Sequence, residues 1–213
     1  MTARVLVVDY GIGNLYSVRR ALESVGAEVT ISADPDDIAR ASRLVLPGVG
    51  AFAAGMAGLR ERGLVELIRQ HGLSGRPLMG ICLGMQMLAG LSEEFGHHQG
   101  LDLIAGRVVA VPSSATDGGR LKIPNIGWRA LQPGAGTDWS GTALASTVPG
   151  TPVYLVHSFH FVPEDPLRAL ALCEYGGHRV TTAVSHGQII GCQFHPEKSG
   201  PAGLQILSQF VRS

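Results

Sequence analysis

Short apolar runs alternate with segments of helical period in the first half of the chain, and this alternation constrains the fold more than any other feature. The apolar runs predict strands over residues 5–8, 28–31, 44–46 and 77–81. The segments between and after them predict helices over residues 15–25, 35–40, 64–71 and 83–89. Strands and helices in this order form a parallel sheet whose crossover helices cover its faces.

The second half contains short apolar runs that are separated by Gly and Pro. These runs predict strands over residues 108–111, 153–156, 169–173, 181–185 and 188–193. Residues 185–188 predict a hairpin turn, residues 202–212 predict a closing helix, and residues 112–150 predict an extended, functional surface loop. We therefore expect one α/β domain over residues 1–213, with a mixed, mostly parallel central sheet flanked by helices.

Composition excludes several classes of protein. Hydrophobic residues make up 45% of the chain and charged residues 16%, so the chain can bury a core and is not of the disordered class. Seventeen basic residues balance seventeen acidic ones, and without a positive field we expect no nucleic-acid partner. Pro and Gly interrupt the apolar stretches before they reach the roughly 20 residues that span a bilayer. We therefore expect no membrane association.

Cysteine and histidine usage bears on redox chemistry and on metal sites. The chain has three widely spaced cysteines, Cys82, Cys173 and Cys192. Their number and spacing predict neither a disulfide framework nor a C-x-x-C metal site, and the first ten residues lack the layout of a signal peptide, so we expect a cytoplasmic protein. His97 and His98 lack further ligands at metal spacing, and residues 11–16 lack the third glycine of a dinucleotide-binding loop. We expect no metal and no cofactor.

A candidate nucleophile lies where the apolar run over residues 77–81 passes directly into a helical segment. Gly80 and Gly84 flank Cys82, as in the sharp strand-to-helix turns that expose a nucleophile. The free N–H groups at the start of a helix favour a thiolate at Cys82, and the amide of Leu83 can bind an oxyanion. The alternative is that Cys82 is a buried core residue, which we expect of the other two cysteines.

A base and an orienting carboxylate occur together within residues 194–200. His195 and Glu197 are two residues apart, so their side chains lie on the same side of an extended chain. Glu197 can then hold one ring nitrogen of His195 while the other faces Cys82. An isolated His-x-Glu is more often a solvated strand edge, but its pairing with a cysteine turn in an α/β chain indicates catalysis.

A second oxyanion donor is predicted in residues 47–50, which follow the strand over residues 44–46. Glycine lets a peptide plane turn its N–H group into a site, so this loop is the candidate. Without the cysteine turn and the His-x-Glu pair, an ordinary strand-to-helix turn would be the preferred interpretation. His157, in an apolar strand, is interpreted as a hydrogen-bonded core residue, with a role in the site left open by its neighbour Ser158.

The cysteine turn, residues 194–200 and residues 47–50 together resemble the class I (triad) glutamine amidotransferases. Three further segments, residues 9–15, 122–128 and 154–159, are similar to the glutaminase subunits of imidazole glycerol phosphate synthase, from histidine biosynthesis. The resemblance extends over essentially the whole chain. It implies hydrolysis of L-glutamine to glutamate and ammonia through a cysteinyl thioester. It also implies a heterodimer with a (β/α)8-barrel cyclase subunit, which uses the ammonia to form imidazole glycerol phosphate and AICAR.

The resemblance also implies roles for individual residues. It makes Cys82 the nucleophile, His195 the general acid and base, and Glu197 the orienting partner of His195. The positions that would hold glutamine are Gly48, Gln86, Glu94, Ser158 and Phe159, with Glu94 suited to the α-ammonium group. The oxyanion would be bound by Leu83, Val49 and Gly50, and the positions near the partner interface are Asn14, Trp128 and Lys198. The chain departs from residues common in the family at Arg129, Phe159 and His160.

Other functions are open at this point. A glutaminase that serves another synthase, such as the one that makes pyridoxal phosphate, would share the triad, but residues 10–15 and 122–128 argue against it. A non-catalytic partner-binding module on the same fold would lack a member of the triad, whereas all three residues are present. A cysteine peptidase fits less well, because Gln86 and Glu94 suit an amino-acid substrate better than a peptide.

Overall fold

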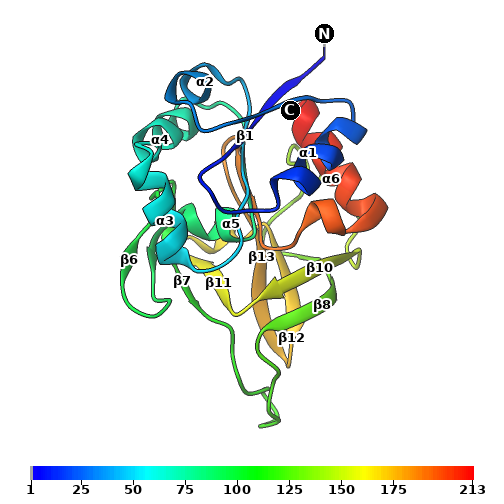
Figure 1. Ribbon diagram of the computed structural model, residues 1–213. Coiled ribbons are helices and arrows are strands. Elements are labelled where there is room, and N and C mark those ends of the chain that lie inside the picture. Colours follow the sequence, from blue (N-terminus) through cyan, green and yellow to red (C-terminus); the bar gives the residue numbers. More distant parts are fainter. Residues whose placement is uncertain (1) are drawn as a thin grey trace.

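An eight-stranded mixed sheet forms the centre of the computed structural model, which describes residues 2–213 (Figure 1). Its strands are β1 (Arg4–Val8), β2 (Glu28–Ser32), β3 (Leu44–Leu46), β4 (Leu78–Ile81), β9 (Gln132–Pro133), β12 (Ala171–Tyr175), β13 (His178–His186) and β14 (Ile189–Cys192). Their order is β2-β1-β3-β4-β14-β13-β12-β9. The pairs from β2 to β14 are parallel, and those from β14 to β9 are antiparallel. The predicted α/β fold is therefore confirmed.

Helices cover both faces of this sheet, as Figure 1 shows. They are α1 (Leu15–Ser24), α2 (Pro35–Arg40), α3 (Phe52–Glu61), α4 (Val65–Leu73), α5 (Leu83–Met87) and α6 (Gly200–Arg212). Alternate residues of β1 point to opposite faces of the sheet. Val5 and Val7 pack in one core with α1 and α6. Leu6 and Val8 pack in a second core with α2, α3, α4 and α5. The sheet thus separates two apolar layers, as expected for strands buried on both faces.

Two smaller sheets lie beside the main one. A four-stranded sheet has the order β11-β7-β5-β6 and consists of β5 (Ala89–Ser92), β6 (His98–Gln99), β7 (Ile104–Ala110) and β11 (Phe159–Pro163). A two-stranded antiparallel sheet consists of β8 (Asn125–Ala130) and β10 (Pro152–His157). Two single-turn 3-10 helices, Pro166–Arg168 and Pro196–Lys198, complete the regular structure.

Three sequence-based predictions need correction. Residues 112–150 are not one surface loop, because they contain β8 and β9 and bury Trp139 and Leu144 in the core beside α1 and α6. The strand predicted at residues 153–156 exists, but it pairs with β8 outside the main sheet. The helix predicted over residues 83–89 ends at Met87, since residues 89–92 join the four-stranded sheet as β5. Among residues 2–213, no helix has the length and apolar character that crossing a membrane requires.

Candidate active site

Cys82 occupies the sharp turn between β4 and α5. Its φ of 55° and ψ of −109° are rare for a residue with a side chain, and its N–H group donates to the Cys192 carbonyl oxygen at 2.7 Å. A Cβ atom on Gly84 would lie 1.8 Å from the carbonyl oxygen of Leu46, and one on Gly80 would lie 2.6 Å from the Gly84 carbonyl oxygen. Both flanking glycines are therefore required by close backbone approach, and the predicted strained turn is present.

His195 and Glu197 form a buried pair next to this turn. Nδ1 of His195 lies 2.8 Å from Oε1 of Glu197, and the two side chains are 3% and 1% exposed. A carboxylate can only accept, so Nδ1 carries the hydrogen and Nε2 is left for another group. The His195 backbone is held on both sides, because its N–H group donates to the Tyr154 carbonyl at 3.0 Å and its carbonyl accepts from the Ser199 hydroxyl at 2.7 Å.

The electrostatics of the site favour a protonated His195. Burial lowers the pKa of His195, but the nearby Cys82 and the hydrogen-bonded carboxylate of Glu197 raise it by more, so that it lies at about 9. At neutral pH, His195 can therefore hold a proton. A protonated histidine beside a thiolate is the combination that can attack a carbonyl carbon and then protonate the leaving group.

A cavity of about 310 Å³ opens at Cys82, within the range of small-molecule sites. It brings together residues that are far apart in the sequence, among them most of those predicted to hold glutamine or the oxyanion: Val49, Gly50, Cys82, Leu83, Gln86, Glu94, Ser158, Phe159 and His195. Gly48 was also predicted to hold glutamine, but it lies outside this lining. A Cβ atom there would be 2.4 Å from the Tyr10 hydroxyl, so Gly48 permits close packing behind the site.

The amide predicted to bind the oxyanion is already engaged. The Leu83 N–H group donates to the carbonyl oxygen of Gly48 at 3.4 Å. The preceding carbonyl, that of Pro47, accepts a 2.6 Å hydrogen bond from the buried Tyr10 hydroxyl. In this conformation Leu83 cannot also donate to an oxyanion, so the peptide of Gly48 has to turn before the predicted oxyanion hole is complete.

Three residues of the lining make hydrogen bonds to main-chain groups that hold the cavity wall in place. The carboxylate of Glu94 accepts from the Phe52 N–H group and so caps α3, a helix with no side-chain cap of its own. Nε2 of Gln86 donates to the Phe159 carbonyl at 3.0 Å, and Nδ1 of His157 donates to the same oxygen at 2.9 Å. Burial lowers the pKa of His157 to about 4, so this histidine stays neutral and keeps its hydrogen on Nδ1 at neutral pH.

The family model for class-I glutamine amidotransferases matches residues 6–213 of the chain. The chain belongs to the class-I glutamine amidotransferases. It is 49% identical to imidazole glycerol phosphate synthase subunit HisH 1 of Legionella pneumophila (strain Paris), over 98% of both chains. It is 44% identical to subunit HisH of Syntrophotalea carbinolica, over 97% of this chain and 98% of the relative. The solved structure of PurLQS from Thermotoga maritima shares the fold, with a TM-score of 0.71 at 20% identity over 100% of this chain and 98% of that one.

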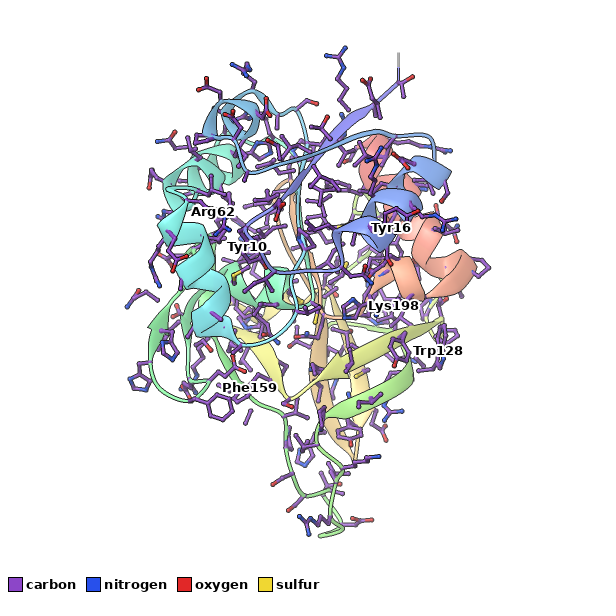
Figure 2. The ribbon with its side chains drawn as sticks, in the orientation of Figure 1. Tyr10, Tyr16, Arg62, Trp128, Phe159 and Lys198 are labelled. Atoms are coloured by element: carbon purple, nitrogen blue, oxygen red, sulfur yellow. The ribbon has the colours of Figure 1, made fainter. Side chains whose placement is uncertain are left out.

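The three residues predicted to lie near a partner are exposed in this amidotransferase. Asn14 caps α1 with its side chain, Trp128 is 52% exposed on β8, and Lys198 follows the catalytic pair. Figure 2 shows Trp128 and Lys198 on the same side of the view as Tyr16, another exposed aromatic residue. The Trp128 ring packs edge-on against Tyr154, whose carbonyl holds the His195 amide. Tyr154 therefore contacts both this surface and His195, the candidate base.

Two residues of the amidotransferase site were not predicted to act there. Gln193 is fully buried and donates from Nε2 to the Cys82 sulfur at 3.7 Å. Its position two residues before His195 was the available signal, because alternate residues of an extended chain share a side. Tyr10 lay in a segment similar to the family, but nothing in its pattern indicated the bond to Pro47. Residues 2–213 contain no cluster of three or more His, Cys, Asp or Glu side chains able to hold a metal.

Proposed function

We propose that this amidotransferase is the glutaminase subunit of imidazole glycerol phosphate synthase, in the cytoplasm, and that residues 1–213 form one amidotransferase domain. The main observation in support of this chemistry is that Cys82, His195 and Gln86 line the same cavity. The side chain of Glu197 is buried and pairs with His195. The relatives that are 44–49% identical over nearly their full length bear this subunit's name, which supports the assignment to histidine biosynthesis.

In this proposal the Cys82 thiolate attacks the side-chain amide carbon of L-glutamine, and the C–N bond breaks as the imidazolium of His195 gives its proton to the leaving nitrogen. Ammonia leaves and a glutamyl thioester remains on Cys82. His195, now neutral, takes a proton from water, which attacks the thioester carbon. Glutamate is released and the thiolate is restored. Glu197 keeps the ring in one tautomer through the Nδ1 hydrogen bond.

The oxyanion of each tetrahedral intermediate is bound by the Leu83 amide together with amides of Val49 and Gly50. This step requires the Gly48 carbonyl to leave the Leu83 N–H group. Glu94 pairs with the α-ammonium group of the substrate, and Gln86, Ser158 and Phe159 complete the glutamine site. The loop at residues 47–50 therefore decides whether a bound glutamine meets a complete or an incomplete oxyanion hole.

Coupling to a partner has a chemical reason. Ammonia that reaches bulk water becomes ammonium, which is not a nucleophile, so a synthase benefits from receiving it directly. We assign the partner-facing surface to the side that bears Asn14, Trp128 and Lys198, with a (β/α)8-barrel cyclase subunit seated there as a heterodimer. The cyclase then uses the ammonia to form imidazole glycerol phosphate and AICAR.

The test is a glutamate-release assay on the isolated chain and on its mixture with the cyclase and the ribonucleotide substrate of the cyclase. We expect release to rise when both are present. Cys82→Ala should abolish release but leave ammonia-dependent synthesis by the complex intact. No rise with the cyclase would overturn the assignment to this synthase, and release retained by the Cys82 variant would overturn the assignment of the nucleophile.

A further inference from the structure

Gln193 lies between β14 and the catalytic pair, and its carboxamide contacts the nucleophilic sulfur. Its side chain is 0% exposed, so water does not compete for its hydrogen bonds. Nε2 is 3.7 Å from Sγ of Cys82, within the range of an N–H to sulfur hydrogen bond. Its backbone is fixed as well, since its N–H group donates to the Thr182 carbonyl at 2.8 Å. The residue has no part in the glutaminase mechanism given above.

The orientation of this carboxamide follows from a main-chain carbonyl. The Phe159 oxygen can only accept, so the end of Gln86 that lies 3.0 Å from it is the NH₂ group. The same NH₂ group lies 3.0 Å from Gln193, so the atom of Gln193 that it meets must be the oxygen. The NH₂ group of Gln193 is therefore the end that faces Cys82. The chain of hydrogen bonds leaves no freedom for the amide to flip.

The backbone of Gln86 is also bonded to the turn that contains Cys82. Its N–H group donates to the Cys82 carbonyl oxygen at 3.2 Å, in the first turn of α5. The two glutamines thus link the sulfur to Phe159, a wall of the glutamine cavity, through side chains that are both buried. Hydrogen bonds in such a network are stronger than in water and strengthen one another.

We propose that Gln193 is a further catalytic residue of the glutaminase reaction, and that its fixed NH₂ group donates to the Cys82 thiolate, stabilises its charge and aims it into the cavity. The proposal rests on the proposed function, in which Cys82 is the nucleophile. Gln193 complements His195, because the imidazolium gives its proton away during the reaction, whereas the amide hydrogen stays in place throughout. The sulfur keeps one donor when His195 becomes neutral.

The decisive measurement is the rate at which iodoacetamide alkylates Cys82 in the isolated full chain as a function of pH, read by mass spectrometry of the peptide that contains Cys82. The thiolate is the reactive form, so the midpoint of the profile reports its stabilisation. Gln193→Met keeps the size of the side chain and removes the donor, and we expect its midpoint to move upward by about one unit. Gln193→Glu keeps an acceptor for Gln86 but brings an oxygen to the sulfur, and its midpoint should move further.

Thr182→Val is the matched control, because Thr182 is buried on the neighbouring strand β13 and its hydroxyl has no hydrogen-bond partner among residues 2–213. This variant should keep the wild-type midpoint. In the complex with the cyclase, kcat/KM of Gln193→Met should fall at pH 7, by at most about tenfold, and recover as the pH approaches the new midpoint, with KM changed less than twofold. A residue that acts only in packing would lower the rate at every pH.

Unchanged midpoints in both Gln193 variants would overturn the proposal. If Gln193→Met loses its native circular dichroism, Gln193→Leu takes its place, because leucine also removes the donor and adds no charge beside the sulfur. Alkylation needs neither glutamine nor a partner, so the midpoints remain informative if the proposed function fails. That failure would be seen separately, as wild-type protein that releases no glutamate with the cyclase.

Discussion

Tyr10 holds the loop that must move before the oxyanion hole is complete, and Tyr10→Phe tests this directly. The ring is 1% exposed, so phenylalanine keeps its packing and removes only the hydroxyl that donates to the Pro47 carbonyl at 2.6 Å. Burial, together with the nearby charge of Cys82, raises the pKa of Tyr10, so the hydroxyl is a donor at any physiological pH. The variant therefore removes one buried hydrogen bond that stabilises the present loop conformation.

The size of the effect follows from that one bond. A hydrogen bond between neutral groups contributes about 1 kcal/mol net, which is about a fivefold change in an equilibrium. The conformation with Gly48 bonded to Leu83 should lose this much relative to a turned one in which the Pro47 carbonyl has left the Tyr10 hydroxyl. We expect glutamate release by the isolated Tyr10→Phe chain to rise about fivefold, and stimulation by the cyclase to fall by a similar factor.

Steady-state glutamate release with and without the cyclase measures both quantities. Tyr175→Phe is the matched control, because its hydroxyl also donates to a main-chain carbonyl, that of Lys122, and Tyr175 is not among the residues that line the cavity. Glutamate release by the isolated Tyr175→Phe chain should equal that of the wild type. Basal release by Tyr10→Phe at or below the wild-type rate, in a variant with native thermal unfolding, would refute the reasoning.

Three further changes test the turn, the catalytic pair and the buried histidines. Gly84→Ala would place Cβ 1.8 Å from the Leu46 carbonyl oxygen and should lower the free energy of unfolding by about 3 kcal/mol in urea titrations. Glu197→Gln should move the alkaline limit of the rate profile below the present His195 pKa of about 9 and lower kcat about 100-fold. Burial lowers the pKa values of His71, His157 and His160 to about 4, so the unfolded chain takes up protons between pH 6.5 and 4 that the native state does not. The contribution of these three histidines to stability should therefore be full above pH 6.5 and fall by about 3 kcal/mol per histidine toward pH 4, and His71→Gln should remove one third of the combined fall in urea titrations at each pH.

The parts of the fold that the sequence predicted well are those whose signals are local. The helix over residues 35–40 has its own capping residue, Asp34, and a proline in its first turn, and the structure has it with the same bounds. The bend at Cys82 was predicted from two glycines at a fixed spacing, and both are needed there for steric reasons. In each case the residues that fix the conformation lie within four positions of one another.

The missed elements depend on residues far away in the sequence. Helix α3 begins at Phe52 without a side-chain cap of its own, and the cap comes from Glu94, 42 positions later. Strand β8 contains Gly127, which is unfavourable in a strand, and exists because it pairs with β10 across the turn-rich segment between them. No window of the sequence contains either pair, so a prediction from local pattern assigns these segments to loops.

The same distinction separates the two halves of the candidate site. The nucleophile and its base can be predicted from residue types, because a thiol, an imidazole and a carboxylate have few other uses in such spacings. The oxyanion donor is a main-chain amide, which every residue possesses, and its availability depends on which acceptor it faces. Here the Leu83 amide faces the Gly48 carbonyl, and a single N–H group cannot also serve the oxyanion at full strength. In the proposed mechanism, stabilisation of the thiolate and completion of the oxyanion hole are thus separate requirements. Gln193 and His195 serve the first, and Tyr10 and the loop at residues 47–50 serve the second.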